Sequence, residues 1–502
     1  MIFEPFQLNH LTLENRIVLP AMVTRLSGED GHVNEDIRNR YVRFAKGEPG
    51  LIVVEAMAVH SAKSGPLLRI GSDEYLPGLR DLAKAVHDVS PSKVVPQIIH
   101  FLKISRSGYR QTIDELGTED IAAIVEQYAV AATRARIAGF DGVELHMAHA
   151  YTLASFLSRL NPRRDAYGGS LENRLRLPTE VLVRTRRAVG SDFTIGVRFL
   201  GEECIKDGYT SHDAIHIAER LALAGADYLS LSVGGKFEDA IPRPGEPLYP
   251  YTGYSGERCM PGSNHPDGAN LHIAETVRAH LRKAGIRTPV VATGKIGSLE
   301  MAEHAISREK ADLVGMARAL LADPDLPKKW RAGQEERVVR CLYGNVCKAL
   351  DENFKRVVCT LWPKGSLDAP ESNDTVAPTW PESGAELVAS CASGRVVLKW
   401  KAALDDEGLY GYQVFRSEDG GRFVHYASLR ARSTRFEDGR VVSGHRYRYF
   451  VRPYDLAGNR GPQSDIVDVD VPATIAPSEA SSTVVRKRAV PVLGICSRGE
   501  VS

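Results

Sequence analysis

The segment "EDIAAIVEQYAVAATRARIAGFDGVELH" (residues 119–146) places a helical pattern directly before a short apolar strand pattern. Apolar residues recur at three- and four-residue spacing through 119–139, which is typical of a helix with one buried face. The run 140–146 that follows has the length of one strand and is largely apolar. Such strands are common in parallel sheets whose two faces are covered by helices.

Seven further apolar runs of strand length occur before residue 330, and most precede a helical pattern such as 213–226. The eight segments expected as strands are 16–21, 50–56, 94–100, 140–146, 193–199, 227–235, 288–294 and 311–317. Eight strand–helix units favour an α/β fold of the (β/α)8 TIM-barrel type. A doubly wound sheet is the weaker alternative, because no G-x-G-x-x-G run follows any of these strands.

The chain changes character after the expected barrel. Residues 1–365 hold the strand–helix units and a short extension, and 366–384 is a linker rich in Pro, Ser and acidic residues. Short alternating strands with Gly, Asp and Asn turns between them predict a small all-β sandwich over 385–472. The tail 473–502 is rich in Ser and Ala and then basic, and we expect it to be disordered.

Composition narrows the classes of protein. The 502 residues include 64 Lys and Arg against 63 Asp and Glu, so the net charge of +1 does not favour nucleic acid or an anionic membrane as a partner. Seven scattered cysteines fit a reducing compartment better than a disulfide scaffold. The first residues contain no apolar stretch of the signal-peptide type. We therefore expect a cytoplasmic protein.

Polar and basic residues gather at the carboxyl ends of the expected strands, where barrel enzymes carry their chemistry. They include Gln97, Arg198 and two glycine-bearing basic turns, "GK" at 294–295 and "GMAR" at 315–318. These turns follow the seventh and eighth strands, which is where barrels often bind phosphate. The alternative is that each residue only caps its own strand.

The stretch "VELHMAHAY" (143–151) ends one strand with His146, His149 and Tyr151 close together. Buried groups of this kind need hydrogen-bond partners. Three interpretations are open: a ligand site, a zinc site with histidine ligands, or buried histidines bonded to the backbone.

Several stretches carry a family resemblance: "NRIVLPAMVTR", "GLIVVEA", "HMAHAYTLASFLSRLNPRRDAYGGSLENR", "VATGKI" and "ADLVGMARALLADPDL". With these stretches, residues 1–330 resemble the old yellow enzyme family of flavin-dependent oxidoreductases, including the barrel of 2,4-dienoyl-CoA reductase. The resemblance implies a non-covalent FMN. The residues that would hold it are Ala21, Met22, Thr24, Ala56, Gln97 and Arg198 around the isoalloxazine, and Gly294, Lys295, Ala317 and Arg318 around the phosphate.

The resemblance also implies an activity, the reduction of activated C=C bonds in α,β-unsaturated carbonyl compounds with NAD(P)H as the electron donor. His146 and His149 would donate hydrogen bonds to the substrate carbonyl oxygen, and Tyr151 would protonate the α-carbon. The alternatives are an FMN-dependent dehydrogenase or demethylase that runs oxidatively, and a flavin-binding scaffold without catalysis. The expected partner is a small activated alkene.

Two places depart from a simple barrel. The insertion 236–270 carries Tyr249, Tyr251 and Tyr254 and could cover the flavin, or could serve as a contact between copies in a homo-oligomer. Relatives of the dienoyl-CoA reductase type hold a 4Fe–4S cluster after the barrel, but this chain has only three cysteines in 341–359. Because a cluster held only by cysteines needs four thiolates, the sequence argues against the cluster and predicts no metal site.

The segment 385–472 resembles a fibronectin type III domain, with Trp400 as its core tryptophan. Tyr447 would then form the tyrosine corner of that fold.

Overall fold

The computed structural model describes residues 1–502 except 63–64, 104–110, 235–255, 372–373, 393 and 473–502. Within the described residues, eight parallel strands close into a barrel in the order β10-β3-β4-β5-β6-β7-β8-β9. These strands are β3 (Ile17–Leu19), β4 (Leu51–Ala58), β5 (Lys93–Ile99), β6 (Gly142–Met147), β7 (Thr194–Leu200), β8 (Tyr228–Ser232), β9 (Val290–Ala292) and β10 (Leu313–Gly315). The predicted TIM barrel is confirmed, and each of its strands overlaps a segment expected from the sequence.

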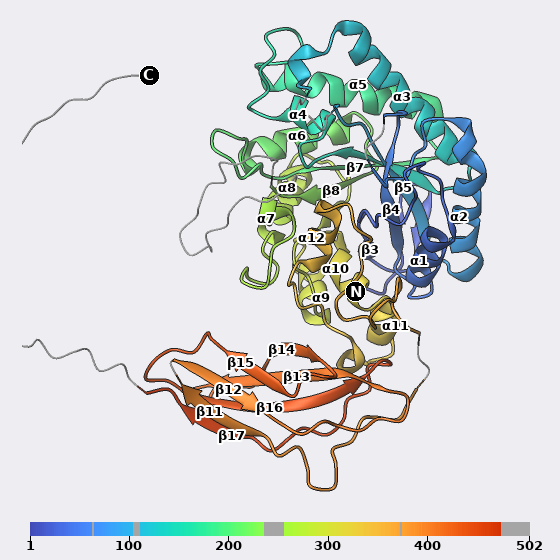
Figure 1. The fold of residues 1–502 in the computed structure, drawn as a ribbon. Helices are drawn as coiled ribbons and strands as arrows, with labels where there is room; N and C mark the ends of the chain where they lie inside the picture. Colours follow the sequence, from blue (N-terminus) through green and yellow to red (C-terminus); the bar gives the residue numbers. More distant parts are fainter. Residues whose placement is uncertain (63–64, 104–110, 235–255, 372–373, 393, 473–502) are drawn as a thin grey trace, which may run out of the picture.

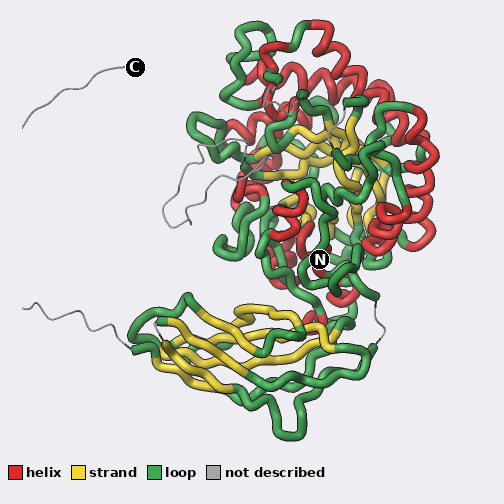
Figure 2. The backbone as a smooth tube through the Cα atoms, viewed as in Figure 1, coloured by secondary structure: helices red, strands yellow, loops and turns green. Residues whose placement is uncertain are grey.

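Helices surround the barrel on its outer side (Figure 1, Figure 2). The helices of the described residues are α1 (Glu35–Ala45), α2 (Leu76–Val89), α3 (Thr118–Ile137), α4 (Thr152–Leu157), α5 (Leu171–Val189), α6 (Ser211–Leu223), α7 (Gly256–Cys259), α8 (Leu271–Lys283), α9 (Leu299–Ser307), α10 (Ala317–Ala322), α11 (Leu326–Arg331) and α12 (Val346–Glu352). Of these, α7 and α12 lie at the rim of the barrel and carry residues that line its pocket. The two helical patterns quoted from the sequence are α3 and α6. None of the helices in the described part of the chain is long and apolar enough to cross a bilayer.

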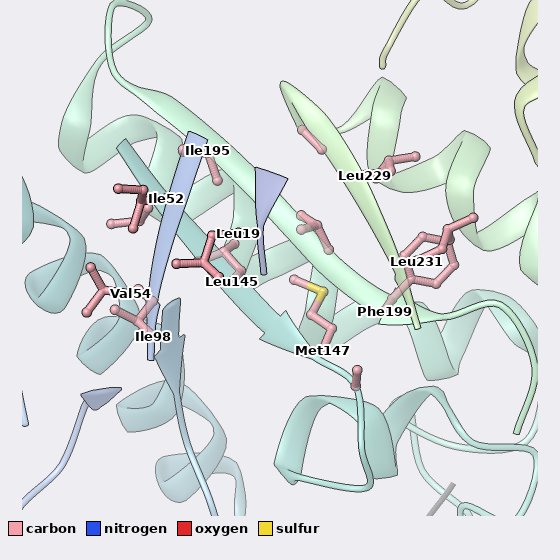
Figure 3. Packing of buried hydrophobic residues seen from close by; sticks show 14 of the residues in the cluster. Leu19, Ile52, Val54, Ile98, Leu145, Met147, Ile195, Phe199, Leu229 and Leu231 are labelled. Carbon is pink, nitrogen blue, oxygen red and sulfur yellow. The ribbon is translucent and has the colours of Figure 1, made fainter. Parts of the chain in front are cut away.

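Side chains alternate between the two faces of the barrel wall. Leu145 of β6 and Leu229 of β8 pack in the layer between strands and helices (Figure 3). Val53, Val95 and Tyr228 belong to a separate cluster that fills the barrel interior. This interior cluster also includes residues of a hairpin, β1 (Phe6–Leu8) and β2 (Leu11–Leu13), so the hairpin is packed onto the inner core. Period-two alternation therefore decides which polar residues of a strand face inward.

The C-terminal part is built of two antiparallel sheets. One sheet has the order β11 (Val388–Ala392), β12 (Arg395–Lys399), β15 (Arg435–Asp438), and the other has the order β14 (Val424–Arg430), β13 (Leu409–Glu418), β16 (Arg446–Asp455), β17 (Val467–Asp470). Trp400, Tyr412 and Tyr447 are buried in one core cluster with residues from both sheets. The predicted all-β sandwich is thus confirmed as two antiparallel sheets around one core. The tail 473–502 lies outside the described residues.

The sandwich packs directly against the extension that follows the barrel (Figure 1). Tyr410 and Tyr454 of the sandwich share an apolar cluster with Cys341 and Cys359 of the extension. Arg430 adds a hydrogen bond from Nε to the backbone oxygen of residue 360 at 3.1 Å. The appended sheets therefore cover the cysteine-bearing segment.

Candidate functional site

One pocket lies at the carboxyl ends of the barrel strands and gathers the predicted site residues, with the exception of Thr24. The predicted residues that line it are Ala21, Met22, Ala56, Gln97, His146, His149, Tyr151, Arg198, Gly294, Lys295, Ala317 and Arg318. They come from segments spread over almost 300 residues of sequence and meet because parallel strands end at the same rim.

Strand register places the central polar residues beside one another. Gln97 pairs with Glu144 across β5 and β6, and His146 pairs with Arg198 across β6 and β7. Glu144 is buried, and its carboxylate accepts hydrogen bonds from Gln97 Nε2 at 2.7 Å and from the Tyr228 hydroxyl at 3.1 Å. Burial raises the pKa of Glu144. This carboxyl group fixes the orientation of the Gln97 amide at the pocket wall.

Arg198 is a buried cation at the base of the pocket. Its guanidinium donates to Ser230 Oγ at 2.9 Å and to Ser232 Oγ at 3.3 Å. Among the described residues Arg198 forms no ion pair, and its charge lowers the pKa of Glu144 by less than burial raises it. A buried guanidinium bonded only to hydroxyl groups suits a ligand with an electron-rich edge, such as the pyrimidine side of a flavin.

His146 and His149 form a directed chain of hydrogen bonds. The backbone N–H of Ala148 donates to His146 Nδ1 at 3.3 Å, so the ring proton of a neutral His146 lies on Nε2. His146 Nε2 lies 3.3 Å from His149 Nδ1, and His149 Nε2 lies 2.7 Å from Ser232 Oγ. Burial lowers the pKa of His149 to about 3 and that of His146 well below its ordinary value. Both rings are therefore neutral donors at pH 7.

The backbone of this turn is held in an uncommon conformation. His149 and Ala150 have φ values of 57° and 56°, in the left-handed region that residues other than glycine rarely adopt. Strained conformations of this kind cost about 1–3 kcal/mol each and persist where the surroundings require them. In this turn the His149 ring lies against Ser232 of β8, which is two strands along the barrel from β6.

Cys259 lines the pocket but was not among the site residues predicted from the sequence. Its Sγ lies 3.2 Å from His149 Nε2 and 3.9 Å from Ser232 Oγ. Cys259 lies in the insertion 236–270, and Tyr249, Tyr251 and Tyr254 of that insertion lie outside the described residues. Only the tertiary structure brings this thiol to the histidine pair.

The predicted phosphate cations lie together at the other end of the pocket. Lys295 has a φ of 60° directly after Gly294, whose φ is 116°. Arg318 donates to the backbone oxygen of residue 261 at 2.8 Å and to Asn345 Oδ1 at 2.7 Å. The Tyr343 ring lies against both cations, 4.8 Å from the guanidinium carbon of Arg318 and 5.1 Å from Lys295 Nζ. Lys295 Nζ also forms an ion pair with Asp267 Oδ1 at 3.2 Å, so an incoming anion would compete with this carboxylate. Two buried cations beside a glycine turn still fit a phosphate.

Thr24 is not among the residues that line the pocket, although Val23 and Arg25 on either side of it are. Its backbone N–H donates to Glu55 Oε2 at 3.1 Å, and its hydroxyl accepts from the Leu26 N–H at 3.2 Å. Tyr41 hydroxyl lies 3.4 Å from the same Glu55 oxygen. The contact of the Thr24 hydroxyl with a flavin stays a prediction.

Glu55 predicts a pH dependence of stability. It is buried, its Oε1 has no hydrogen-bond partner within the described residues, and burial raises its pKa to about 7. The folded chain thus keeps this proton between about pH 4.5 and 7 while the unfolded chain releases it, so stability falls as pH rises through that range. This loss in the free energy of unfolding is on the order of 2–4 kcal/mol, and Glu55→Gln should remove it. Melting temperatures of both proteins at pH 5 and pH 8 test this.

Glu119→Gln, on the exposed start of α3, is the matched control and should leave the pH profile unchanged. If Glu55→Gln and the wild type lose stability equally between pH 5 and 8, the buried carboxyl does not cause the loss.

The zinc interpretation of the histidine pair gains no support from geometry. Among the described residues, the groups of His, Cys, Asp and Glu with ligand atoms within 4.8 Å of one another do not include His146 or His149. Their ring nitrogens bond to each other and to Ser232.

Comparisons with known proteins agree with this geometry. The model of the NADH:flavin oxidoreductase / NADH oxidase family matches residues 1–114 and 102–337. A NADH oxidase of Thermoanaerobacter brockii is 32% identical over 400 residues, which cover 75% of this chain and 58% of that protein. A NADPH dehydrogenase of Geobacillus sp. (strain WCH70) is 34% identical over 345 residues, covering 65% of this chain and 92% of that protein.

Among solved structures, histamine dehydrogenase from Rhizobium sp. 4-9 is 25% identical, with a TM-score of 0.62 and coverage of 75% of this chain and 55% of that chain. The chain thus spans little more than half the length of the NADH oxidase and the histamine dehydrogenase that it matches. Both similarities extend beyond the barrel residues of the family model.

Proposed function

The chain belongs to the NADH:flavin oxidoreductase / NADH oxidase family, and we propose that it is an FMN-dependent NAD(P)H oxidoreductase that reduces activated C=C bonds of α,β-unsaturated carbonyl compounds. The observation that carries the proposal is a single pocket in which two neutral histidines, a tyrosine and a buried arginine meet. NAD(P)H would supply the electrons, and an activated alkene would accept them.

The cofactor part of the proposal rests on the two ends of the pocket. Lys295 and Arg318, with the turn at Gly294, would hold the phosphate, and Gln97 and Arg198 would hold the pyrimidine edge of the ring. When bound, FMN supplies the hydride chemistry that no side chain provides. The fixed guanidinium of Arg198 favours negative charge at its edge of the pocket.

The substrate part rests on the histidine pair. A carbonyl oxygen that enters the pocket would replace His149 Nδ1 as the acceptor of the His146 Nε2 proton. It would compete with Ser232 and Cys259 for the proton on His149 Nε2. Two neutral N–H donors aimed at one oxygen stabilise the negative charge that develops there, and the Tyr151 hydroxyl would deliver the proton to the α-carbon.

The purified protein should be yellow and should release FMN, not FAD, when it is heated. Two clustered cations and a glycine turn serve one phosphate, and no dinucleotide fingerprint follows a barrel strand. Chromatography of the released flavin and absorbance before and after anaerobic NADPH addition measure this. Release of FAD, or no flavin binding after reconstitution with FMN, would overturn the cofactor assignment.

A second candidate is oxidation with the same pocket, since the solved relative named above is a histamine dehydrogenase. Anaerobic half-reactions separate the two directions. Reduction of the flavin by NADPH and reoxidation by cyclohexenone support the reductive function. Reduction of the flavin by an amine, with no response to NADPH, supports the oxidative one.

The absence of a 4Fe–4S cluster remains a proposal, supported by the number of cysteines near the pocket. Burial raises the pKa of Cys341 to about 11, that of Cys359 to about 12, and that of Cys347 as well. These pKa values apply to the thiols without a metal, because a bound metal ion deprotonates its thiol ligands. The support for the proposal is the number of thiols, which is three where a cluster held only by cysteines needs four. Within the described part of the chain the remaining cysteines lie on other elements.

Iron and acid-labile sulfide should therefore be substoichiometric in protein prepared anaerobically. A side chain added at Gly344 would meet nothing within 4 Å, so Gly344→Cys supplies a fourth thiol without a clash. Iron content of the wild type and of Gly344→Cys after iron–sulfur reconstitution shows whether the missing fourth thiol causes the low iron content. About four irons per wild-type chain would contradict the proposal and would require a ligand from elsewhere.

We also propose that the C-terminal sandwich is of the fibronectin type III kind. Support comes from its division into three- and four-stranded sheets and from the buried Trp400. The hydroxyl of Tyr447 accepts a hydrogen bond from the Val442 N–H five residues upstream at 2.9 Å, as a tyrosine corner does.

A further inference from the structure

Two histidines and a glutamate converge on the outer surface of the barrel, far from the chemistry of the pocket. His216 and Glu219 lie three residues apart on α6, so they share one face of that helix. His280 lies on α8, which packs beside α6 (Figure 1). One ligand atom from each of the three residues lies within 4.8 Å of the others.

The contacts within the group place nitrogen and oxygen donors around one point. His280 Nε2 lies 2.7 Å from Glu219 Oε2, and the His216 and His280 rings lie 5.5 Å apart at an angle of 78°. The side chains of His280 and Glu219 are 24% and 32% exposed, so the group is reachable from solvent and partly ordered by its neighbours.

We propose that His216, Glu219 and His280 bind a divalent transition-metal ion of the zinc class, which joins α6 to α8. Imidazole nitrogen and carboxylate oxygen are ordinary zinc ligands, with bonds of about 2.0–2.2 Å. A tetrahedral ion needs ligand atoms roughly 3.3 Å apart, a value that follows from these bond lengths. The His280–Glu219 pair must open slightly from 2.7 Å and His216 must close in, which surface side chains achieve by small rotations.

The charges around the group favour this ion. Glu219 brings one negative charge, and the metal would replace the hydrogen bond that Glu219 Oε2 makes with His280 Nε2. The neighbouring cation Arg220 is turned to Glu172, with which it forms an ion pair at 2.6 Å, so it does not occupy the site. Water would complete the coordination from the exposed side.

The site would act on structure and not on the reaction itself. The helices α6 and α8 follow β7 and β8 in the chain, and these two strands carry Arg198, Ser230 and Ser232. A metal that binds only the folded chain raises its stability by mass action. Zinc should therefore raise the melting temperature without entering the pocket.

The test uses the full chain without a polyhistidine tag, treated with a chelator and then titrated with zinc chloride by calorimetry. Wild type should bind one more equivalent than the double variant His216→Ala/His280→Ala, and Glu219→Gln should weaken that equivalent by at least 10–100-fold, as changes around metal ligands do. His272→Ala, an exposed histidine on the same helix α8, is the matched control and should bind as wild type does.

Cobalt chloride supplies a second readout, because Co²⁺ at this site should give a visible d–d band in the wild type and His272→Ala that is missing in the double variant. Circular dichroism melts without metal should agree among the four proteins, since all substituted side chains are surface groups. Equal zinc stoichiometry and affinity in wild type and the double variant would overturn the proposal. An equal loss in His272→Ala would overturn it too, because binding would then be unspecific.

Discussion

Replacing Tyr151 with phenylalanine should slow alkene reduction by about 10²–10⁴-fold and leave flavin reduction by NAD(P)H near its normal rate. Tyr151 lines the pocket beside His146, and the two ring centroids are 5.2 Å apart. Tyr151 is the N-cap residue of α4. Phenylalanine keeps the ring and its packing and removes only the hydroxyl. Anaerobic stopped-flow measurement of the two half-reactions separates reduction of the flavin by NAD(P)H from reduction of the alkene, to which the proton transfer belongs.

The control for this change is Tyr167→Phe. Tyr167 lies in the loop before α5, and its hydroxyl is 3.2 Å from Glu180 Oε2. Its side chain does not line the pocket. It should affect neither half-reaction. Slowing of flavin reduction alone in Tyr151→Phe would show that this hydroxyl serves the cofactor and not the alkene. A nitroalkene substrate should lessen the defect, since its product anion can take the proton from water.

The barrel strands could be predicted because each strand is encoded in a short continuous stretch of sequence. Each strand is a short apolar run bounded by turn residues, and each of the eight runs became one barrel strand. Alternation along β5 and β7 then determines that Gln97 and Arg198 face the barrel axis, once the fold is assumed. Residues at strand ends were therefore placed correctly in the pocket from sequence.

Residues that reach the pocket from loops were not predictable in this way. Cys259 meets His149 because the chain returns after a long insertion, and Tyr343 covers Arg318 because the extension folds back over the rim. No periodic pattern encodes such returns. Thr24 shows the opposite limit. It follows the first barrel strand closely, but it does not line the pocket, and its backbone N–H donates to the buried Glu55.

The sandwich illustrates a third limit. Alternating runs indicated its strands, but not that Tyr410 and Tyr454 would cover Cys341 and Cys359. This cover explains physically why these thiols are protonated, because an apolar neighbourhood disfavours the thiolate. The appended sheets thus take part in shaping the segment that also lines the pocket.

Changing His146 and His149 together to alanine should slow hydride transfer to cyclohexenone by on the order of 10²-fold or more, because one lost oxyanion donor alone has an effect of this size. Binding of a phenol, which uses the same donors, should weaken as well. Flavin content should be unchanged, since Lys295 and Arg318, the cations assigned to the phosphate, lie at the other end of the pocket and keep their contacts. Stopped-flow kinetics and a phenol titration of the bound flavin measure these effects.

The backbone supplies a sharp companion variant. His149 has a φ of 57°, a conformation that asparagine tolerates better than other side chains with a donor. His149→Asn therefore keeps both the turn and an N–H group, and it should restore much of the activity that His149→Ala loses. If alanine and asparagine at 149 are equally slow, the imidazole acts through its contacts with Ser232 and Cys259 and not as a donor to substrate. If the double alanine variant reduces cyclohexenone at the wild-type rate, the pocket does not activate the carbonyl group, and the oxidative function becomes the better account of the same residues.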